Sequence, residues 1–187
     1  MAMKYVFVLG AAVSDFEKGV PAASLGRLLK ARGYHVTLQR FTPYFNADPG
    51  RMNPTINGEV FVTDDGAETE QDIGNYERFI DERLMRVANV TAGRIYRTVL
   101  DREHRGDFGG GPVRLDPHIT GEVKRLFSRG ADKIAIIEIG GGICDLETQV
   151  FLKAVRQFRD EVGKENGMIL LLTECEEGLS QDRKSVV

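Results

Sequence analysis

Short apolar runs alternate with amphipathic stretches along most of the chain. The runs rich in β-branched and aromatic residues are candidate strands, at residues 5–9, 35–41, 133–139 and 168–172. The stretches with helical periodicity are candidate helices, at residues 20–33, 76–87, 91–105, 118–129 and 151–162. The run at 133–139 is apolar except for Glu138, which is typical of a central parallel strand buried on both faces. This alternation predicts an α/β fold built on a parallel sheet.

Other stretches interrupt the alternation. Residues 42–58 are rich in proline, asparagine and glycine, so a long and ordered loop is expected there. A short strand at 59–63 leads into an acidic segment, 64–72, for which a solvated loop is expected. Residues 174–187 are polar and show no pattern. Because no repeat or composition shift marks a second domain, we expect one domain over residues 1–173 and a polar tail.

The composition agrees with a single folded domain. The chain has 187 residues, 42% of them hydrophobic, and a net charge of −3. That balance gives no electrostatic reason to expect nucleic acid or a membrane as a partner. The two cysteines, Cys144 and Cys175, share no metal-ligand spacing, and no leader or membrane-spanning run is recognisable. A cytoplasmic location is therefore expected.

The connection between the first candidate strand and the first candidate helix could bind phosphate. Backbone N–H groups at such a helix start point at an anion, and Lys18 could reach it. The generic signature G-x-x-x-x-G-K-[ST] is not met, because Glu17 precedes Lys18 and Gly19 follows it. A capping box explains the same residues, with Ser14 bonding to the first helical turn and Glu17 reaching back. Both interpretations are open on the sequence pattern.

Carboxylates follow the candidate strands on the same expected edge of the sheet. They lie in segments 64–72 and 138–147. Carboxylates beside a lysine-bearing phosphate loop suit a nucleoside triphosphate with Mg²⁺, although a solvated acidic loop and a glycine turn explain them equally well. Glu138 ends a buried run, where an unpaired carboxylate is costly, so we expect it to meet a metal or a cationic side chain.

Several segments together resemble the amidoligase (synthetase) domain of the CTP synthase family. They occur in collinear order from about Lys4 to about Val162, and Gly58–Thr69 is the most specific. The other matching segments are Lys4–Gly10, Ala22–Gly33, Pro43–Tyr44, Asp48–Gly50, Tyr76–Phe79, Gly93–Tyr96, Arg105–Gly106, Pro117–Thr120 and Glu138–Gly141.

The resemblance implies a P-loop fold of the dethiobiotin-synthetase type and a ligase reaction. In this family ATP phosphorylates the 4-oxygen of UTP, and ammonia then displaces the phosphate, giving CTP, ADP and phosphate. The ammonia normally comes from a C-terminal glutamine amidotransferase domain, which we expect this chain to lack. Active members of the family are homotetramers.

The resemblance also implies roles for individual residues. Lys18 is implied as the central group of the ATP phosphate loop, and Arg40 stands where the family has a lysine, so these two are the candidate catalytic residues. Asp72 and Glu138 match positions that hold Mg²⁺. The implied nucleotide-binding residues are Ser14, Asp15, Phe16, Glu17, Lys18, Gly19, Asp145, Leu146 and Glu147, of which Ser14 and the last three match contacts to the pyrimidine nucleotide, UTP or CTP.

The sequence departs from the family at the phosphate loop. Asp15 and Glu17 stand where the family has a serine and a glycine, and Thr42 replaces an aspartate. A carboxylate about 5 Å from a phosphate charge would cost on the order of 3 kcal/mol per unit charge at an effective dielectric of ~20. The departures therefore predict weakened ATP binding.

The family segment that grips UTP has no match in residues 174–187. We expect the isolated chain to be an incomplete amidoligase domain that does not make CTP when ammonia is supplied. The alternative is a non-catalytic homologue that binds nucleotides, or that assembles with and regulates other subunits.

Overall fold

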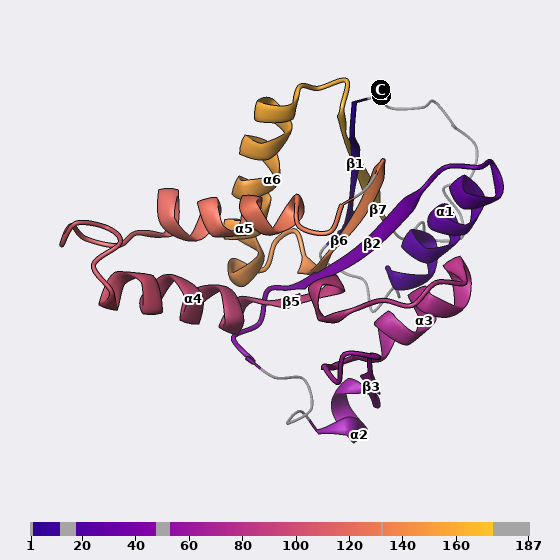
Figure 1. The fold of residues 1–187 in the computed structure, drawn as a ribbon, viewed down its shortest axis with the longest axis horizontal. Helices are drawn as coiled ribbons and strands as arrows, with labels where there is room; N and C mark the ends of the chain where they lie inside the picture. The colour runs from indigo at the N-terminus through magenta and orange to yellow at the C-terminus, as the bar shows by residue number, and fades with distance from the viewer. Residues whose placement is uncertain (1, 12–17, 48–52, 132, 174–187) are drawn as a thin grey trace.

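A parallel β-sheet of five strands forms the centre of the fold in the computed structural model of the chain, which describes residues 2–11, 18–47, 53–131 and 133–173 (Figure 1). The strands, in order across the sheet, are β5 (Asn89–Thr91), β2 (Val36–Thr42), β6 (Ile134–Gly142), β1 (Lys4–Gly10) and β7 (Gly167–Leu172). Every neighbouring pair is parallel. The predicted α/β class and the central position of the strand that carries Glu138 are confirmed, whereas β5 has no counterpart among the predicted strands.

Helices cover both faces of the sheet (Figure 1). One face carries α1 (Gly19–Ala31) and α3 (Gln71–Ile80), and the other carries α4 (Ala92–His104), α5 (Thr120–Phe127) and α6 (Gln149–Val162). Strand β1 supplies both cores because successive side chains point to opposite faces. Val6 and Val8 pack beneath α1 and α3, whereas Phe7 packs beneath α5 and α6.

Phe127 on α5 lies at the centre of the hydrophobic core between the sheet and helices α4, α5 and α6. Its side chain is fully buried. Its ring centroid lies 5.1 Å from that of Phe7, 4.9 Å from that of Phe41 and 5.5 Å from that of Phe158, all in edge-on arrangements. Phe7 lies on β1, Phe41 on β2 and Phe158 on α6, so the aromatic cluster joins α5 to two strands of the sheet and to the neighbouring helix.

A small antiparallel hairpin corrects the expectation of a solvated acidic loop at residues 64–72 in part, because residues 64–66 form an exposed turn but residues 68–70 form a strand. Strand β3 (Val60–Val62) pairs with β4 (Glu68–Glu70), and α3 begins at the next residue. Thr69 is fully buried, and its hydroxyl donates a hydrogen bond to the carbonyl of Phe61 at 2.8 Å. The acidic residues of β4 therefore belong to an ordered strand whose alternate side chain is buried.

Helix α3 corrects the predicted helix at 76–87. It begins five residues earlier, at Gln71, and ends at Ile80, because Asp81 adopts a left-handed conformation with φ 53°. The Glu77 carboxylate accepts a hydrogen bond at 2.8 Å from the backbone N–H of Leu84, and Leu84 itself lies outside any helix. A short 3-10 turn, η2 (Arg86–Ala88), leads into β5.

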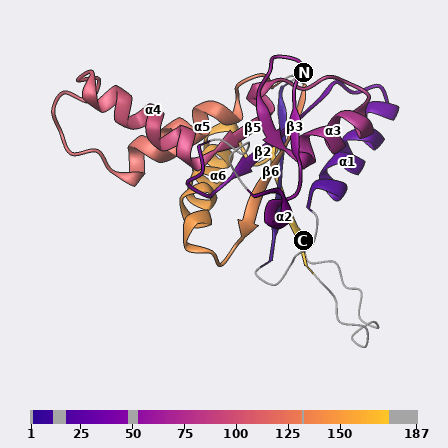
Figure 2. The same ribbon diagram turned by 90° about the horizontal axis from the view of Figure 1, so that it is seen from below.

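The next predicted helix, at 91–105, begins with a strand residue. Thr91 ends β5 and is also the N-cap of α4, its hydroxyl accepting a hydrogen bond from the N–H of Arg94 at 3.3 Å. Helix α4 extends beyond the edge of the sheet in both views (Figures 1 and 2).

The remaining helical elements are short. They are α2 (Pro54–Asn57), within the predicted long loop, the π-helical turn η3 (Leu115–Ile119), which precedes α5 and shortens the predicted helix at 118–129, and η4 (Leu146–Thr148). Within the described ranges, no helix has the length and hydropathy needed to cross a bilayer.

Candidate functional site

Lys18 lies at the carboxyl-terminal edge of the sheet, immediately before α1. Its side chain runs against Gly10, the last residue of β1; a Cβ atom on Gly10 would lie 2.6 Å from the Lys18 Cε. The Lys18 ammonium donates hydrogen bonds to the carbonyl of Gly141 and, at 3.5 Å, to that of Ile139, both on β6. Only 8% of the residue is exposed. The lysine is thus folded onto the strand ends that the sequence predicted would surround a ligand.

The charge of Lys18 is set by its neighbours. Burial lowers the pKa of Lys18 below its ordinary value, while the nearby carboxylates of Glu138 and Asp145 oppose that effect and Arg40 adds to it. The carbonyl oxygens of Ile139 and Gly141 and the carboxylates of Glu138 and Asp145 therefore stabilise the buried ammonium.

Helix α1 starts directly after Lys18 in the described part of the chain. The helix begins at Gly19, and its N-cap position belongs to Lys18, whose side chain makes no capping hydrogen bond. The capping-box interpretation itself rests on Ser14 and Glu17, which lie outside the described residues, so it stays a prediction. The predicted nucleotide-binding residues Ser14, Asp15, Phe16 and Glu17 lie outside the described residues, so their roles stay predictions.

Arg40 and Glu138 stand opposite each other on neighbouring strands. They are register partners in the β2–β6 pairing, and the Arg40 Nη1 donates to the Glu138 Oε1. The same nitrogen lies 3.1 Å from the Asp72 Oδ2 at the start of α3. The structure therefore brings Asp72, Glu138 and Arg40 together, as expected for residues of one site. The expectation that Glu138 meets a cation is confirmed, and the cation is a guanidinium.

Glu70 is a fourth member of the cluster that the sequence reasoning did not single out. The Arg40 Nε donates to the Glu70 Oε2 at 2.5 Å, and the Thr42 hydroxyl donates to the Glu70 Oε1. The sequence carries no strand signal at this point, because Glu68, Thr69 and Glu70 are all polar. The burial of Thr69 between two carboxylates is visible only in the structure.

Tyr76 on α3 completes the environment of Glu138. Its buried hydroxyl donates a hydrogen bond to the Glu138 Oε2. Burial raises the pKa of Glu138, with Arg40 and Tyr76 opposing the shift, and burial likewise raises the pKa of Tyr76 well above its ordinary value. Burial alone would lower the pKa of Arg40, but Glu138 and Glu70 raise it well above the ordinary value. Arg40 is thus a permanent cation.

The predicted Mg²⁺ ligands are adjacent, yet they do not fit a metal ion as they stand. Mg²⁺ needs carboxylate oxygens and waters in an octahedral shell. Both Glu138 oxygens already accept hydrogen bonds from protein donors, and a single Arg40 nitrogen occupies the space between Glu138 and Asp72. In the described part of the chain, no group of three or more His, Cys, Asp or Glu side chains is arranged to hold a metal ion.

Three of the predicted pyrimidine-nucleotide residues, Asp145, Leu146 and Glu147, lie in the turn after β6, and the fourth, Ser14, lies outside the described residues. The Asp145 Oδ2 accepts a hydrogen bond from the N–H of Gly142 at 2.6 Å, which closes the turn. Leu146 is 83% exposed, and Glu147 and Cys144 are also exposed. Asp145 lies close enough to Lys18 to affect its pKa. The turn therefore adjoins the Lys18 side of the site and leaves Leu146 and Glu147 accessible to a ligand.

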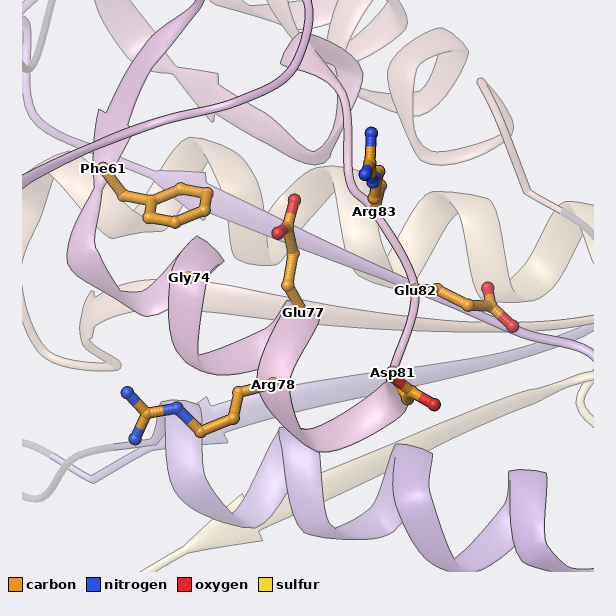
Figure 3. Close-up of a pocket in the computed structure, with 7 residues that line it drawn as sticks. All are labelled: Phe61, Gly74, Glu77, Arg78, Asp81, Glu82 and Arg83. Carbon is orange, nitrogen blue, oxygen red and sulfur yellow. The ribbon is translucent and has the colours of Figure 1, made fainter.

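A separate groove of about 560 Å³ lies on the outer side of α3 (Figure 3). Its lining residues are Phe61, Gly74, Glu77, Arg78, Asp81, Glu82 and Arg83. The ring of Phe61 lies over Gly74, where an added Cβ would come within 2.6 Å of it. None of the predicted site residues lines this groove, so it is distinct from the edge that carries Lys18 and Arg40.

Comparisons with known proteins identify the family of the chain. The family model described as CTP synthase N-terminus matches residues 4–184. The chain is 53% identical over 177 residues to a CTP synthase from Ruminiclostridium cellulolyticum, which covers 92% of this chain and 33% of that protein. It is 56% identical over 165 residues to a CTP synthase from Rubrobacter xylanophilus (87% and 30%) and 54% identical over 174 residues to one from Bacillus subtilis (91% and 32%). The chain spans about a third of the length of these relatives.

Proposed function

This chain belongs to the CTP synthase N-terminus family, and from that membership we propose that it provides the nucleotide site of the synthetase reaction in pyrimidine nucleotide biosynthesis. In that reaction ATP phosphorylates the 4-oxygen of UTP. Ammonia then replaces the phosphate, so that UTP, ATP and ammonia become CTP, ADP and phosphate.

The observation that carries the proposal is the position of Lys18. It stands before the first turn of α1, between the ends of β1 and β6, where ligands of open parallel sheets bind. The positive end of the α1 helix dipole and the Lys18 ammonium together favour a phosphate. The carbonyls of Ile139 and Gly141 that now accept from Lys18 hold the ammonium at this edge until a phosphate oxygen replaces them.

The turn after β6 would receive the pyrimidine nucleotide. Asp145 closes the turn through Gly142, and the exposed Leu146 and Glu147 are free to contact a base or ribose. Because the turn adjoins Lys18, a nucleotide there would lie near the phosphates of ATP. Mg²⁺ accompanies ATP in such reactions, and we assign it no protein ligand here because the oxygens of Glu138 are already engaged.

ATP titration by calorimetry tests the proposal with Lys18→Met as the key variant. The loss of ATP affinity is expected to be roughly 10- to 100-fold, because a hydrogen bond to a charged group contributes about 1.5–3 kcal/mol. Lys164→Met is the matched control, since Lys164 is exposed and lies just before β7, at the opposite end of the sheet. Equal ATP affinities for Lys18→Met and the unaltered chain would contradict the proposal.

Glu17→Gly tests the predicted repulsion in the phosphate loop. We expect this variant to bind ATP more tightly than the unaltered chain, because a carboxylate next to the phosphates is removed. Unchanged or weaker binding would show that Glu17 does not oppose the nucleotide.

A non-catalytic, nucleotide-binding or regulatory homologue is the second candidate. It is favoured by the closed ion pairs of Arg40 with Glu70, Asp72 and Glu138, which engage carboxylates that a catalytic metal would use. CTP formation from UTP, ATP and ammonium separates the two. Nucleotide binding without CTP favours the second candidate, and CTP above background supports the first.

Assembly is a further part of the proposal. We expect a homo-oligomer, a tetramer by analogy with the family, working in the cytoplasm with nucleotides as ligands and with neither nucleic acid nor membrane as a partner. A mass measurement in solution, with and without nucleotide, tests the oligomeric state. A monomer under both conditions would count against it.

A further inference from the structure

Arg40 stands at the centre of three carboxylates that come from three different elements. Glu138 lies on β6, Glu70 ends β4, and Asp72 is in the first turn of α3. We propose that Arg40 is the resident cation of this site and takes the place between Asp72 and Glu138 that a divalent metal would occupy. The protein alone then holds no divalent cation between these two carboxylates.

The fork of the guanidinium makes this possible. Arg40 Nη1 joins Asp72 and Glu138, while Nε of the same group donates to Glu70 at 2.5 Å. A guanidinium carries its donors in a fixed, planar arrangement, whereas a lysine ammonium is a single point of charge on a flexible stem. A lysine at this position could not meet all three carboxylates in the same way.

The second carboxylate oxygens of Glu138 and Glu70 also accept hydrogen bonds from protein donors. Glu138 accepts from Tyr76 with its second oxygen, and Glu70 accepts from Thr42 with its second oxygen. The Thr42 hydroxyl is a donor, whereas an aspartate at position 42 would set another negative charge against Glu70. Arg40 and Thr42, two positions that depart from the family pattern, therefore act on one carboxylate, Glu70.

Burial shields the ion pairs of Arg40 from solvent. The Arg40 side chain is 17% exposed, and the Glu138 side chain is 1% exposed. A guanidinium does not lose its proton in proteins, so a metal ion would have to displace a permanent cation. The three carboxylates and the guanidinium alone carry a net charge of −2, and the nearby Lys18 ammonium adds one positive charge beside Glu138. If Arg40 is removed, the three carboxylates alone carry −3 and the space between Asp72 and Glu138 is open to a metal.

The inference concerns the protein without nucleotide and does not depend on the proposed function. An Mn²⁺ titration of the full chain without nucleotide tests the inference. Binding is measured as the loss of the electron paramagnetic resonance signal of free Mn²⁺. The variants are Arg40→Gln, Arg40→Lys and Asp72→Asn, and each Arg40 variant is also combined with Asp72→Asn. Failure of ATP to bind would affect the proposed function only, because no step of this titration contains ATP.

We expect the unaltered chain to have no Mn²⁺ site at Asp72, so Asp72→Asn alone should leave its Mn²⁺ binding unchanged. Arg40→Gln is expected to gain one Mn²⁺ site at least about tenfold tighter than any in the unaltered chain, because a positive charge next to the metal is gone. Asp72→Asn should abolish the gained site. The proposal is overturned if the unaltered chain binds Mn²⁺ and Asp72→Asn abolishes that binding. It is also overturned if a folded Arg40→Gln variant gains no Mn²⁺ site.

Arg40→Lys keeps the inference testable if Arg40→Gln does not fold. The lysine retains one charge but cannot bridge the three carboxylates, so we expect a weaker gained site that Asp72→Asn again removes. If Arg40→Lys folds and binds no more Mn²⁺ than the unaltered chain, the fork of Arg40 is not what excludes the metal.

Discussion

The hydroxyl of Tyr76 on α3 donates a hydrogen bond to the Glu138 carboxylate on β6, although the two residues are 62 positions apart. Both side chains are buried. Removal of the hydroxyl in Tyr76→Phe leaves a buried carboxylate oxygen without that donor. We expect a loss of about 1–3 kcal/mol in the free energy of unfolding, measured by urea denaturation.

Tyr34→Phe is the control for this experiment. Tyr34 is 40% exposed and follows the end of α1. Its free energy of unfolding should change by no more than about 0.5 kcal/mol, as for most surface substitutions. Equal losses in the two variants would show that the Tyr76 hydroxyl has no special role.

Gly93 and Gly121 form a second matched pair. An added Cβ at Gly93 would lie 2.8 Å from the backbone nitrogen of Ala47, whereas a Cβ at Gly121 meets nothing within 4 Å. Gly93→Ala should lower the free energy of unfolding by about 1–3 kcal/mol because backbone atoms cannot give way easily. Gly121→Ala, inside α5, should raise it by about 0.5–1 kcal/mol. Thermal denaturation of both variants checks the signs, and a stable Gly93→Ala chain would contradict the close packing.

Phe127→Ala should be strongly destabilising. The ring is fully buried among Phe7, Phe41 and Phe158, so its loss leaves a cavity that costs about 3–5 kcal/mol. Leu28→Ala on α1 is the control, since Leu28 is 56% exposed. Urea unfolding should show a large drop for the first and little change for the second. Similar effects would place Phe127 outside the main core.

The hydrogen bonds of Asp116 predict that the stability of the fold decreases at acidic pH. Its carboxylate accepts hydrogen bonds from Lys153 at 2.7 Å and from Thr120 and Gln157, which hold the pKa of Asp116 well below its ordinary value. A depressed pKa in the folded state means that the stabilisation is present above the pKa of the unfolded chain. It is lost as the pH falls from about 4 toward the lower folded pKa.

Asp116→Asn should therefore lose stability near neutral pH and show a flatter decline between about pH 4 and pH 2. Melting temperatures across this range measure the effect, with Asp160→Asn on the exposed surface of α6 as the control. A decline for Asp116→Asn as steep as that of the unaltered chain would contradict the prediction.

Much of the fold was accessible from local pattern. The strand around Glu138 is recognisable because a parallel strand buried on both faces needs an apolar run. The end of α3 was not accessible, because Phe79, Ile80 and Leu84 continue a helical spacing beyond Ile80. The left-handed Asp81 and the bond from Leu84 to Glu77 end the helix there. Strand β5 was hidden because its three residues form a strand only by pairing with β2.

By itself, the sequence determined the alternation of strands and helices, the family, and part of the candidate site, namely Lys18, Arg40, Asp72 and Glu138, since these follow from periodicity and from motif order. Only the tertiary structure decided what Arg40 does. Its partners at positions 70, 72 and 138 meet it because the hairpin and α3 pack across the ends of β2 and β6. An ion pair depends on distance in space, and neither periodicity nor spacing along the chain contains that distance.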